Sequence, residues 1–347
     1  MRCGDFRQSY AEDMAIFESP LPRWLLAALL AVLVAIPFFT GTYWLDVLNR
    51  IFIAIIAAAG LNIVTGFTGL ISLGTAAFLA VGGYTTAALA GKAGLPFVVV
   101  IPLSGALTAL VGLVFGIPSL RLKGLYLAVA TLAAHYIVEF TASHWDSVTG
   151  GVNGISLPAA KAGPLVLSTD REVYLLILVI MVGMLFFAKN LFRTKVGKAF
   201  VAIRDQDISA EVMGVNVFRY KLLSFAVSSF YIGVAGSLLA YQARLISPEN
   251  FPITLAIDYL GMVIIGGLGS ILGSIFGAIF VTLLPEMLRL GTDALGNYWP
   301  GLMVIVAPIK TGVFGLVVIL FLIFEPDGMA ARWHHIKTYW KLYPFSY

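Results

Sequence analysis

Long apolar runs separated by short polar connections dominate the pattern of this chain. A membrane-spanning helix needs about 20 mostly apolar residues, and ten runs approach that length. They lie at residues 24–40, 47–65, 72–91, 96–117, 124–141, 173–190, 222–243, 255–268, 270–288 and 311–325. The pattern therefore predicts an all-α fold, a polytopic integral membrane helical bundle with about ten transmembrane helices.

Two of these runs are weaker than the others, and one further segment does not fit the pattern. The run 47–65 carries Asn49, Arg50 and Asn62, and the run 255–268 is short with two glycines near its end. The segment 298–309, YWPGLMVIVAPI, is apolar but interrupted by proline. Because proline breaks a helix, this segment is expected to be re-entrant or interfacial rather than an eleventh crossing.

Basic residues gather in three connections, and their placement predicts the orientation. Seven Lys and Arg lie in the loop 189–221, and others lie in the turn after the fourth run and in the C-terminal segment. With ten crossings, these segments and both ends of the chain fall on one side. Since Lys and Arg near spans mark the cytoplasmic side, the loop 189–221 and both termini are expected to be cytoplasmic.

The charge pattern also predicts how the chain is divided. We expect a cytoplasmic N-terminal tail at 1–23, a transmembrane domain at 24–328 and a cytoplasmic C-terminal tail at 329–347. The first apolar run ends without the small-residue cleavage site of a secretory signal. The first span is therefore expected to be retained.

Composition agrees with a membrane protein and provides little for catalysis. Hydrophobic residues make up 60% of the chain and charged residues 12%, against about 25% charged in soluble domains. The net charge of +4 is explained by the loops, so nucleic acid is not expected as a partner. No phosphate-binding loop, no metal-ligand cluster and no recognisable nucleophile–base spacing occurs. We expect neither an enzyme nor a metal or cofactor in this chain.

The polar stretch DQDISAEVMGVNVFRYKLL, beginning at Asp205, is unusual among so many apolar segments. Residues 198–213 are compatible with one helix that ends before Gly214, with Ile208 and Val212 one turn apart. Such an amphipathic helix either fits a groove on a partner or is a solvated connector. The periodicity alone leaves both interpretations open.

This stretch resembles the cytoplasmic loop of ABC-transporter permeases, whose pattern is E-A-A, three residues, then Gly. Ser209, Ala210 and Gly214 match that pattern, and Ile208 replaces the Glu. The wider chain resembles the branched-chain amino acid permeases, specifically the LivM-like subunit. The resemblance rests on GLNIVTGFTGLISLGTAAFLAVGGYTTAAL (60–89), RLKGLYLAVATLA (121–133), TGGVNGIS (149–156), AIRDQDISAEVMGVNVFRYKLLSFAVSSFYIGVAGSLLAY (202–241), GGLGSILGSIFGA (266–278) and EPDGMA (325–330).

The resemblance implies an importer assembled from several chains in a prokaryotic cytoplasmic (inner) membrane. A LivH-like second permease, two cytoplasmic ATPase subunits carrying ATP and Mg²⁺, and an external (periplasmic) binding protein are the implied partners, together with membrane lipid. The residues implied to form a coupling helix on an ATPase are Asp205, Asp207, Ile208, Ser209, Ala210, Glu211, Val212 and Gly214.

The implied function is ATP-driven import of branched-chain or related amino acids by alternating access. Permeases for urea, short amides or aromatic acids are similar and stay open as alternatives. A secondary transporter driven by an ion gradient is a third reading. It requires carboxylates deep in the membrane, and the sequence has few of them.

Polar residues inside the runs are candidates for the transport path, although hydrogen bonding between helices explains them equally well. The set comprises Asn62, Thr65, Ser72, Tyr84, Thr85, His135, Glu139 and Asp258. Asp46 and Arg50 are four residues apart and are expected to pair structurally.

Regularly spaced glycines form one further pattern in the sequence. Gly269, Gly273 and Gly277 recur every four residues and predict a face for close helix packing. The stretches TGFTGLISLG and IGGLGSILG are faintly alike, and we do not interpret them as a repeat.

Overall fold

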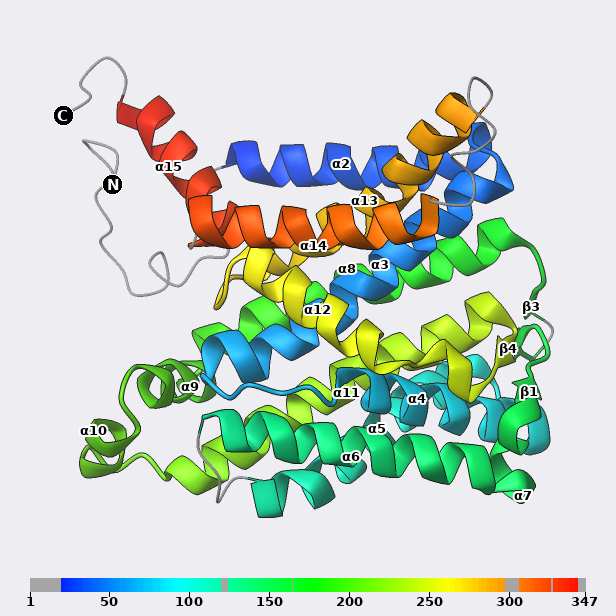
Figure 1. Cartoon of the computed structure of the whole chain (residues 1–347), viewed down its shortest axis with the longest axis horizontal. Coiled ribbons are helices and arrows are strands. Elements are labelled where there is room, and N and C mark those ends of the chain that lie inside the picture. The colour runs from blue at the N-terminus through cyan, green and yellow to red at the C-terminus, as the bar shows by residue number, and fades with distance from the viewer. Residues whose placement is uncertain (1–19, 120–123, 164, 297–305, 326, 343–347) are drawn as a thin grey trace.

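Helices make up most of the computed structural model, which describes residues 20–119, 124–163, 165–296, 306–325 and 327–342 (Figure 1). The helices are α2 (Pro20–Phe39), α3 (Thr42–Asn62), α4 (Thr75–Thr86), α5 (Phe97–Ser119), α6 (Leu125–His144), α7 (Asp146–Thr149), α8 (Asp170–Arg193), α9 (Lys195–Asp205), α10 (Asp207–Val212), α11 (Val217–Ala243), α12 (Ile253–Gly266), α13 (Ile271–Gly296), α14 (Val306–Phe324) and α15 (Gly328–Leu342). Two π-helical turns, η1 (Ile63–Phe67) and η2 (Ala87–Lys92), extend α3 and α4.

The prediction of an all-α membrane protein is confirmed at this level. Within the described ranges, six helices are long and apolar enough to cross a bilayer, and α2 adds a shorter apolar helix. The six are Thr42–Phe67, Phe97–Pro118, Leu125–His144, Asp170–Arg193, Val217–Ala243 and Ile271–Gly291. Each of the ten expected runs overlaps a helix, while the number of crossings stays a prediction. Of the segment 298–309, residues 298–305 lie outside the described structure and 306–309 begin α14.

Helix α11 is the centre of the bundle and packs against α3, α4 and α5. Glycines make these contacts close, because a residue without Cβ lets two backbones approach. A Cβ on Gly82 of α4 would collide with the Gly233 carbonyl oxygen of α11, and one on Gly236 of α11 would collide with the Leu79 carbonyl oxygen. Thr86 donates a hydrogen bond of 2.7 Å to Ser237 across the same contact.

Two helix breaks meet inside the bundle. The α3–η1 helix ends at Phe67, and an extended segment leads to α4. Helix α12 ends at Gly266, before a turn into α13. Gly69 and Gly269 both have positive φ, +75° and +74°, a conformation that favours glycine. A Cβ on Gly66 would collide with the amide nitrogen of Gly269. The two faintly similar glycine-rich stretches are therefore in direct contact.

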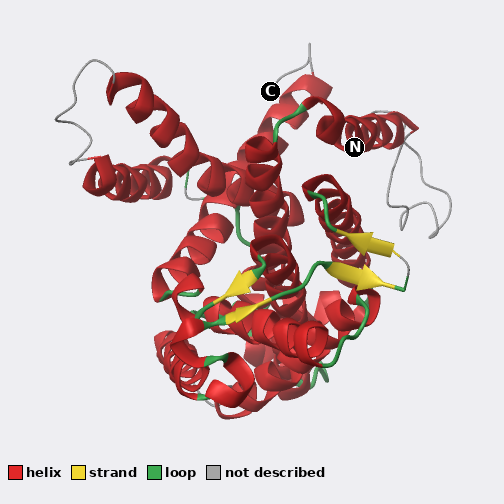
Figure 2. Ribbon diagram, turned by 90° about the vertical axis from the view of Figure 1, so that its right-hand side faces the viewer, coloured by secondary structure: helices red, strands yellow, loops and turns green. Residues whose placement is uncertain are grey.

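The two ends of the bundle differ in structure (Figures 1 and 2). At one end lie α7 and two short antiparallel strand pairs, which the pattern of apolar runs does not predict. Strand β1 (Ile155–Ser156) pairs with β4 (Leu245–Ile246), and β2 (Ala160–Ala162) pairs with β3 (Leu165–Leu167). At the opposite end lie α9, α10, α15 and the start of α2. The loop 189–221, the start of α2 and helix α15 therefore lie at the same end of the molecule.

Candidate functional site

The loop 189–221 includes the end of α8 and the start of α11, and between them it folds as two helices, which corrects the expectation of one helix over 198–213. Helix α9 ends at Asp205, and α10 begins at Asp207. Between them Gln206 has an extended backbone, with φ −163° and ψ 108°. The chain turns at this residue, so α10 stands apart from α9 at the end of the bundle (Figure 1). Hydropathy could not detect this break, because Gln206 is an ordinary helix former.

The C-terminus of α10 is closed by a hydrogen-bonded glycine motif at the position where the helix was expected to stop. The Val215 amide donates to the Ala210 carbonyl at 3.0 Å, and the Gly214 amide donates to the Glu211 carbonyl at 2.9 Å. This pair of bonds is the Schellman arrangement, which needs a left-handed residue. Gly214 supplies it with φ +86°.

Helix α10 exposes an apolar row and buries its opposite side. Ile208, Val212 and Met213 are 65%, 82% and 83% exposed, whereas Ala210 is only 5% exposed. Ser209, Glu211 and Gly214 are exposed around this row. Large exposed apolar side chains in a polar setting mark an interaction surface. The row faces away from the bundle, so it is available to another molecule.

One ion pair joins this exposed helix to the bundle, and a second ion pair and a cap lie at the neighbouring helix ends. Asp207, at the start of α10, lies 3.4 Å from the Lys221 ammonium on α11, with both side chains mostly buried. Asp205 pairs with Arg204 at 3.0 Å. At the start of α11, the Asn216 side chain accepts a hydrogen bond from the Arg219 amide at 3.0 Å. Helix α10 is therefore tied to the start of α11 by the Asp207–Lys221 pair.

Arg204 connects the loop to both helix breaks, a contact that the sequence pattern does not predict. Its guanidinium donates to the Gly66 carbonyl at 3.2 Å. A Cβ on Gly269 would lie 2.6 Å from its Nη1, and one on Gly69 would lie 3.1 Å from its Cγ. In the sequence Arg204 is one of seven basic residues in the loop, and no local signal distinguishes it.

Asn62, a candidate path residue, joins α3 to the turn before α13. Its amide nitrogen donates to the Ser270 carbonyl and to the Ser274 hydroxyl, each at 2.8 Å. Its oxygen accepts from the Gly269 amide at 2.9 Å. The side chain is fully buried with these bonds made, which is the arrangement expected of a link between helices.

Tyr84, His135 and Glu139 come together in space from two helices, α4 and α6. All three line one small cavity of about 10 Å³, and the His135 Nε2 lies 3.6 Å from the Glu139 carboxylate. Within the described structure, the Tyr84 hydroxyl and both His135 ring nitrogens are buried without a hydrogen-bond partner. A space of this size holds one water molecule at most, so it does not accommodate a solute in this conformation.

The other candidate path residues are dispersed. Thr65 lies in η1, Ser72 in the extended segment before α4, and Thr85 in α4. Thr65 and Ser72 are buried, whereas Thr85 is half-buried. Asp258 lies in α12 and is half-buried.

The three spaced glycines divide between a turn and a helix. Gly269 precedes α13 and contacts Arg204 and Gly66, so it does not share a helical face with the other two. Gly273 and Gly277 lie on α13 against α12. A Cβ on Gly273 would lie 2.6 Å from the Gly267 carbonyl oxygen, and one on Gly277 would collide with the Met262 carbonyl oxygen.

Comparison with known proteins places these features in a family. Residues 43–322 match the family described as the branched-chain amino acid transport system permease component. The chain is 35% identical over 272 residues to the high-affinity branched-chain amino acid transport system permease protein LivM of Salmonella typhimurium, and likewise to that of Escherichia coli. Each match covers 72% of this chain and 64% of the relative, so it spans less than two thirds of those relatives.

A less similar relative matches over a comparable length. The chain is 24% identical over 243 residues to the probable branched-chain amino acid transport permease protein LivM of Methanocaldococcus jannaschii, with 67% of each chain covered. No solved structure gives a significant match. The matched region contains α10, both helix breaks and the whole central bundle. This multi-pass membrane protein belongs to the branched-chain amino acid transport permease family.

Proposed function

We propose that this chain is a transmembrane subunit of an ATP-driven importer of branched-chain or related amino acids. It would sit in a prokaryotic inner membrane with the loop 189–221 and both termini in the cytoplasm. Family membership supports the transport role. Its partners would be a second permease, two cytoplasmic ATPase subunits that bind ATP and Mg²⁺, and an external binding protein. The chain itself would perform no chemical step.

The main support for ATPase subunits as partners is the exposed apolar row of α10. Ile208, Val212 and Met213 project from a helix that is fixed on its other side by Ala210 and by the Asp207–Lys221 ion pair. An amphipathic helix with an exposed apolar face is suited to the groove of a partner. In the proposed orientation this helix faces the cytoplasm, which is where ATP is available.

The contacts suggest how motion would pass from α10 into the bundle. When the ATPase subunits close, α10 would shift and carry α9 with it. Arg204 on α9 touches both glycine-rich breaks, through the Gly66 carbonyl and the Gly269 backbone. Helix breaks are suitable hinges, because a few residues there can absorb a change of backbone angle. Movement of both breaks together would open one side of the path while closing the other.

Co-purification from native membranes tests this proposal. The tagged full-length chain is expected to bring down ATPase chains that hydrolyse ATP. The double variant Ile208→Asp/Val212→Asp should lose them, because two charges would be placed in an apolar contact. Val152→Asp is the matched control, since Val152 is a 68% exposed apolar residue at the opposite end of the bundle. Equal ATPase recovery with all three chains would overturn the assignment of α10 as the docking helix.

A further inference from the structure

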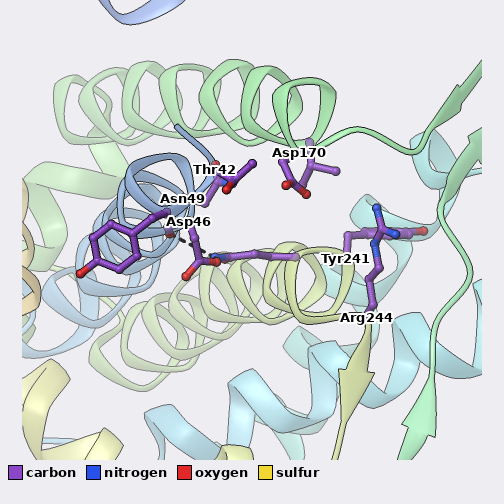
Figure 3. A pocket seen from close by; sticks show the side chains of 9 residues that line it. Thr42, Asp46, Asn49, Asp170, Tyr241 and Arg244 are labelled. Atoms are coloured by element: carbon purple, nitrogen blue, oxygen red, sulfur yellow. Dashed lines mark hydrogen bonds between the residues drawn. The ribbon is translucent and has the colours of Figure 1, made fainter. Parts of the chain in front are cut away.

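A polar cavity of about 310 Å³ lies at the end of the bundle opposite α10. It is formed by the start of α3, the start of α8 and the end of α11 (Figure 3). Pockets for small molecules begin at about this volume, and the space exceeds what one or two water molecules require. In the proposed orientation this end faces outward, where a solute arrives.

Three buried polar atoms at this cavity have no hydrogen-bond partner within the described residues. They are the Asn49 side-chain oxygen, the Tyr241 hydroxyl and the Gln242 side-chain oxygen. Asn49 and Tyr241 are each only 3% exposed. Buried polar atoms are nearly always hydrogen-bonded, because an unmade bond is costly. Three such atoms around one cavity point to a polar ligand.

Charged side chains of both signs border the same space. Asp46 lies 2.9 Å from the Arg50 Nε and accepts a 2.7 Å hydrogen bond from Gln242. This bond holds the Gln242 amide so that its oxygen remains unpartnered. Asp170 at the start of α8 and Arg244 at the end of α11 complete the lining (Figure 3). Acceptors for a cation and a donor for an anion are therefore present together.

The backbone at Arg244 gives independent support for a role of its side chain. Arg244 follows α11 with φ +57°, and among the described residues no other non-glycine has positive φ. Glycine is the usual residue at such a helix end, and another residue there is uncommon. Within the described part of the chain, the Arg244 guanidinium donates one hydrogen bond, of 2.6 Å, to the Ser168 carbonyl. That bond uses one of its five N–H groups.

We propose that this cavity binds a small zwitterion, a primary ammonium beside an anionic group, in the form of a free amino acid. The ammonium would donate to the oxygens of Asn49 and Gln242 near Asp46 and Asp170. The carboxylate would accept from Arg244 and from the Tyr241 hydroxyl. The choice of an amino acid among zwitterions rests on the proposed function. The location of the site rests only on the cavity and its lining.

Two other occupants fit the lining less well. A bare metal ion is disfavoured by the Arg244 charge and by a volume of about 310 Å³, which is far larger than an ion with its protein ligands requires. The headgroup of phosphatidylethanolamine has the same chemistry as an amino acid, an ammonium next to an anion. The experiment must therefore separate these two sources.

Equilibrium binding of radiolabelled L-leucine to the purified full-length chain tests the proposal without ATPase subunits or nucleotide. The chain is placed in lipid nanodiscs of phosphatidylglycerol, with or without phosphatidylethanolamine. Saturable leucine binding that phosphatidylethanolamine does not displace is expected. 4-Methylpentanoate, which lacks the ammonium, and 3-methylbutylamine, which lacks the carboxylate, should each bind at least about tenfold more weakly, because each leaves buried polar groups unpaired.

Variants of the lining should reduce this binding while the fold is kept. Asn49→Leu and Tyr241→Phe are each expected to raise Kd by about 5- to 30-fold through the loss of one bond. Arg244→Gly should do the same, and it suits the backbone at this position because glycine accepts positive φ. Tyr231→Phe is the matched control, since Tyr231 is equally buried but donates to the Met184 carbonyl away from the cavity.

Three results would overturn the proposal. These are the absence of leucine binding, binding that the three lining variants leave unchanged, and displacement of leucine by phosphatidylethanolamine. The last result would assign the cavity to the lipid headgroup. Since no ATPase is present, none of these results bears on the docking role of α10. Conversely, a chain that recruits no ATPase can still bind leucine here.

Discussion

At the scale of single residues, Gly214 shows how one backbone angle positions the exposed helix. Its φ of +86° and its amide bond to Glu211 close α10. Gly214→Pro fixes φ near −65° and removes the amide N–H of residue 214. The C-terminus of α10 should therefore lose its closing hydrogen bonds, and uptake should fall below detection. Gly214→Asn is the control, because Asn tolerates the left-handed region. Equal uptake by the two variants, at equal amounts of chain in the membrane, would contradict this role.

The second prediction for a single residue concerns Arg204. Arg204→Met keeps an apolar stem over Gly69 but removes the donor to the Gly66 carbonyl. We expect the ATPase subunits to remain bound, while uptake per ATP hydrolysed falls by about tenfold. That factor corresponds to the loss of about 1.4 kcal/mol, near the lower limit for one hydrogen bond to a charged group.

The control for Arg204 lies in the same loop. Arg219 has an exposed side chain, and Arg219→Met makes the same chemical change without touching a helix break. Normal coupling of hydrolysis to uptake in Arg204→Met would show that motion reaches the bundle by another route.

At the scale of elements, the contact between α12 and α13 depends on the absence of side chains. A Cβ on Gly277 would collide with the Met262 carbonyl oxygen, which belongs to the backbone of α12 and cannot rotate away. Gly277→Leu should therefore separate the two helices, at a cost of about 3 kcal/mol. A lower Tm of the purified chain in detergent is the expected readout.

The same helix provides the control for Gly277. Among the described residues, a Cβ on Gly291 meets nothing within 4 Å, so Gly291→Leu adds the same side chain to α13 without a clash there. Matching Tm values for the two variants would rule out close packing at Gly277 as a source of stability.

The sequence predicts the apolar helices better than the breaks between helices, for a physical reason. Apolar runs locate α3 and α12 although they were the weakest candidates, because burial in lipid or protein requires apolar side chains along the whole length. The break at Gln206 and the extended segment before α4 leave no such trace. Both depend on contacts between residues distant in sequence, such as Gly66 with Gly269.

At the scale of the whole molecule, the sequence predicts the geometry of a candidate surface where the signal is local, while the role of that surface stays a prediction. The exposed face of α10 follows from helical spacing, as Ile208 and Val212 lie one turn apart. The cavity at the other end combines Asn49, Asp170 and Tyr241 from three helices. In a hydropathy pattern Asn49 only weakens a predicted span, and Tyr241 counts as one more apolar residue. That both residues line the same cavity becomes visible only when the helices are packed together.

The molecule as a whole is organised along the axis that joins these two ends. Helix α10 and the Arg204 contacts lie at one end, the polar cavity lies at the other, and α11 runs between them (Figure 1). The Asp207–Lys221 pair connects α10 to the start of α11, and Tyr241 and Arg244 stand at its end. A single central helix therefore contacts both the proposed motor surface and the proposed solute site.

The source of energy for uptake tests the central claim most directly. The complex purified from native membranes is reconstituted in liposomes, and accumulation of labelled leucine is measured with ATP and Mg²⁺ or with a proton or sodium gradient alone. The account predicts accumulation that requires ATP and disappears with Ile208→Asp/Val212→Asp. Accumulation by this chain alone, driven only by an ion gradient, would contradict it.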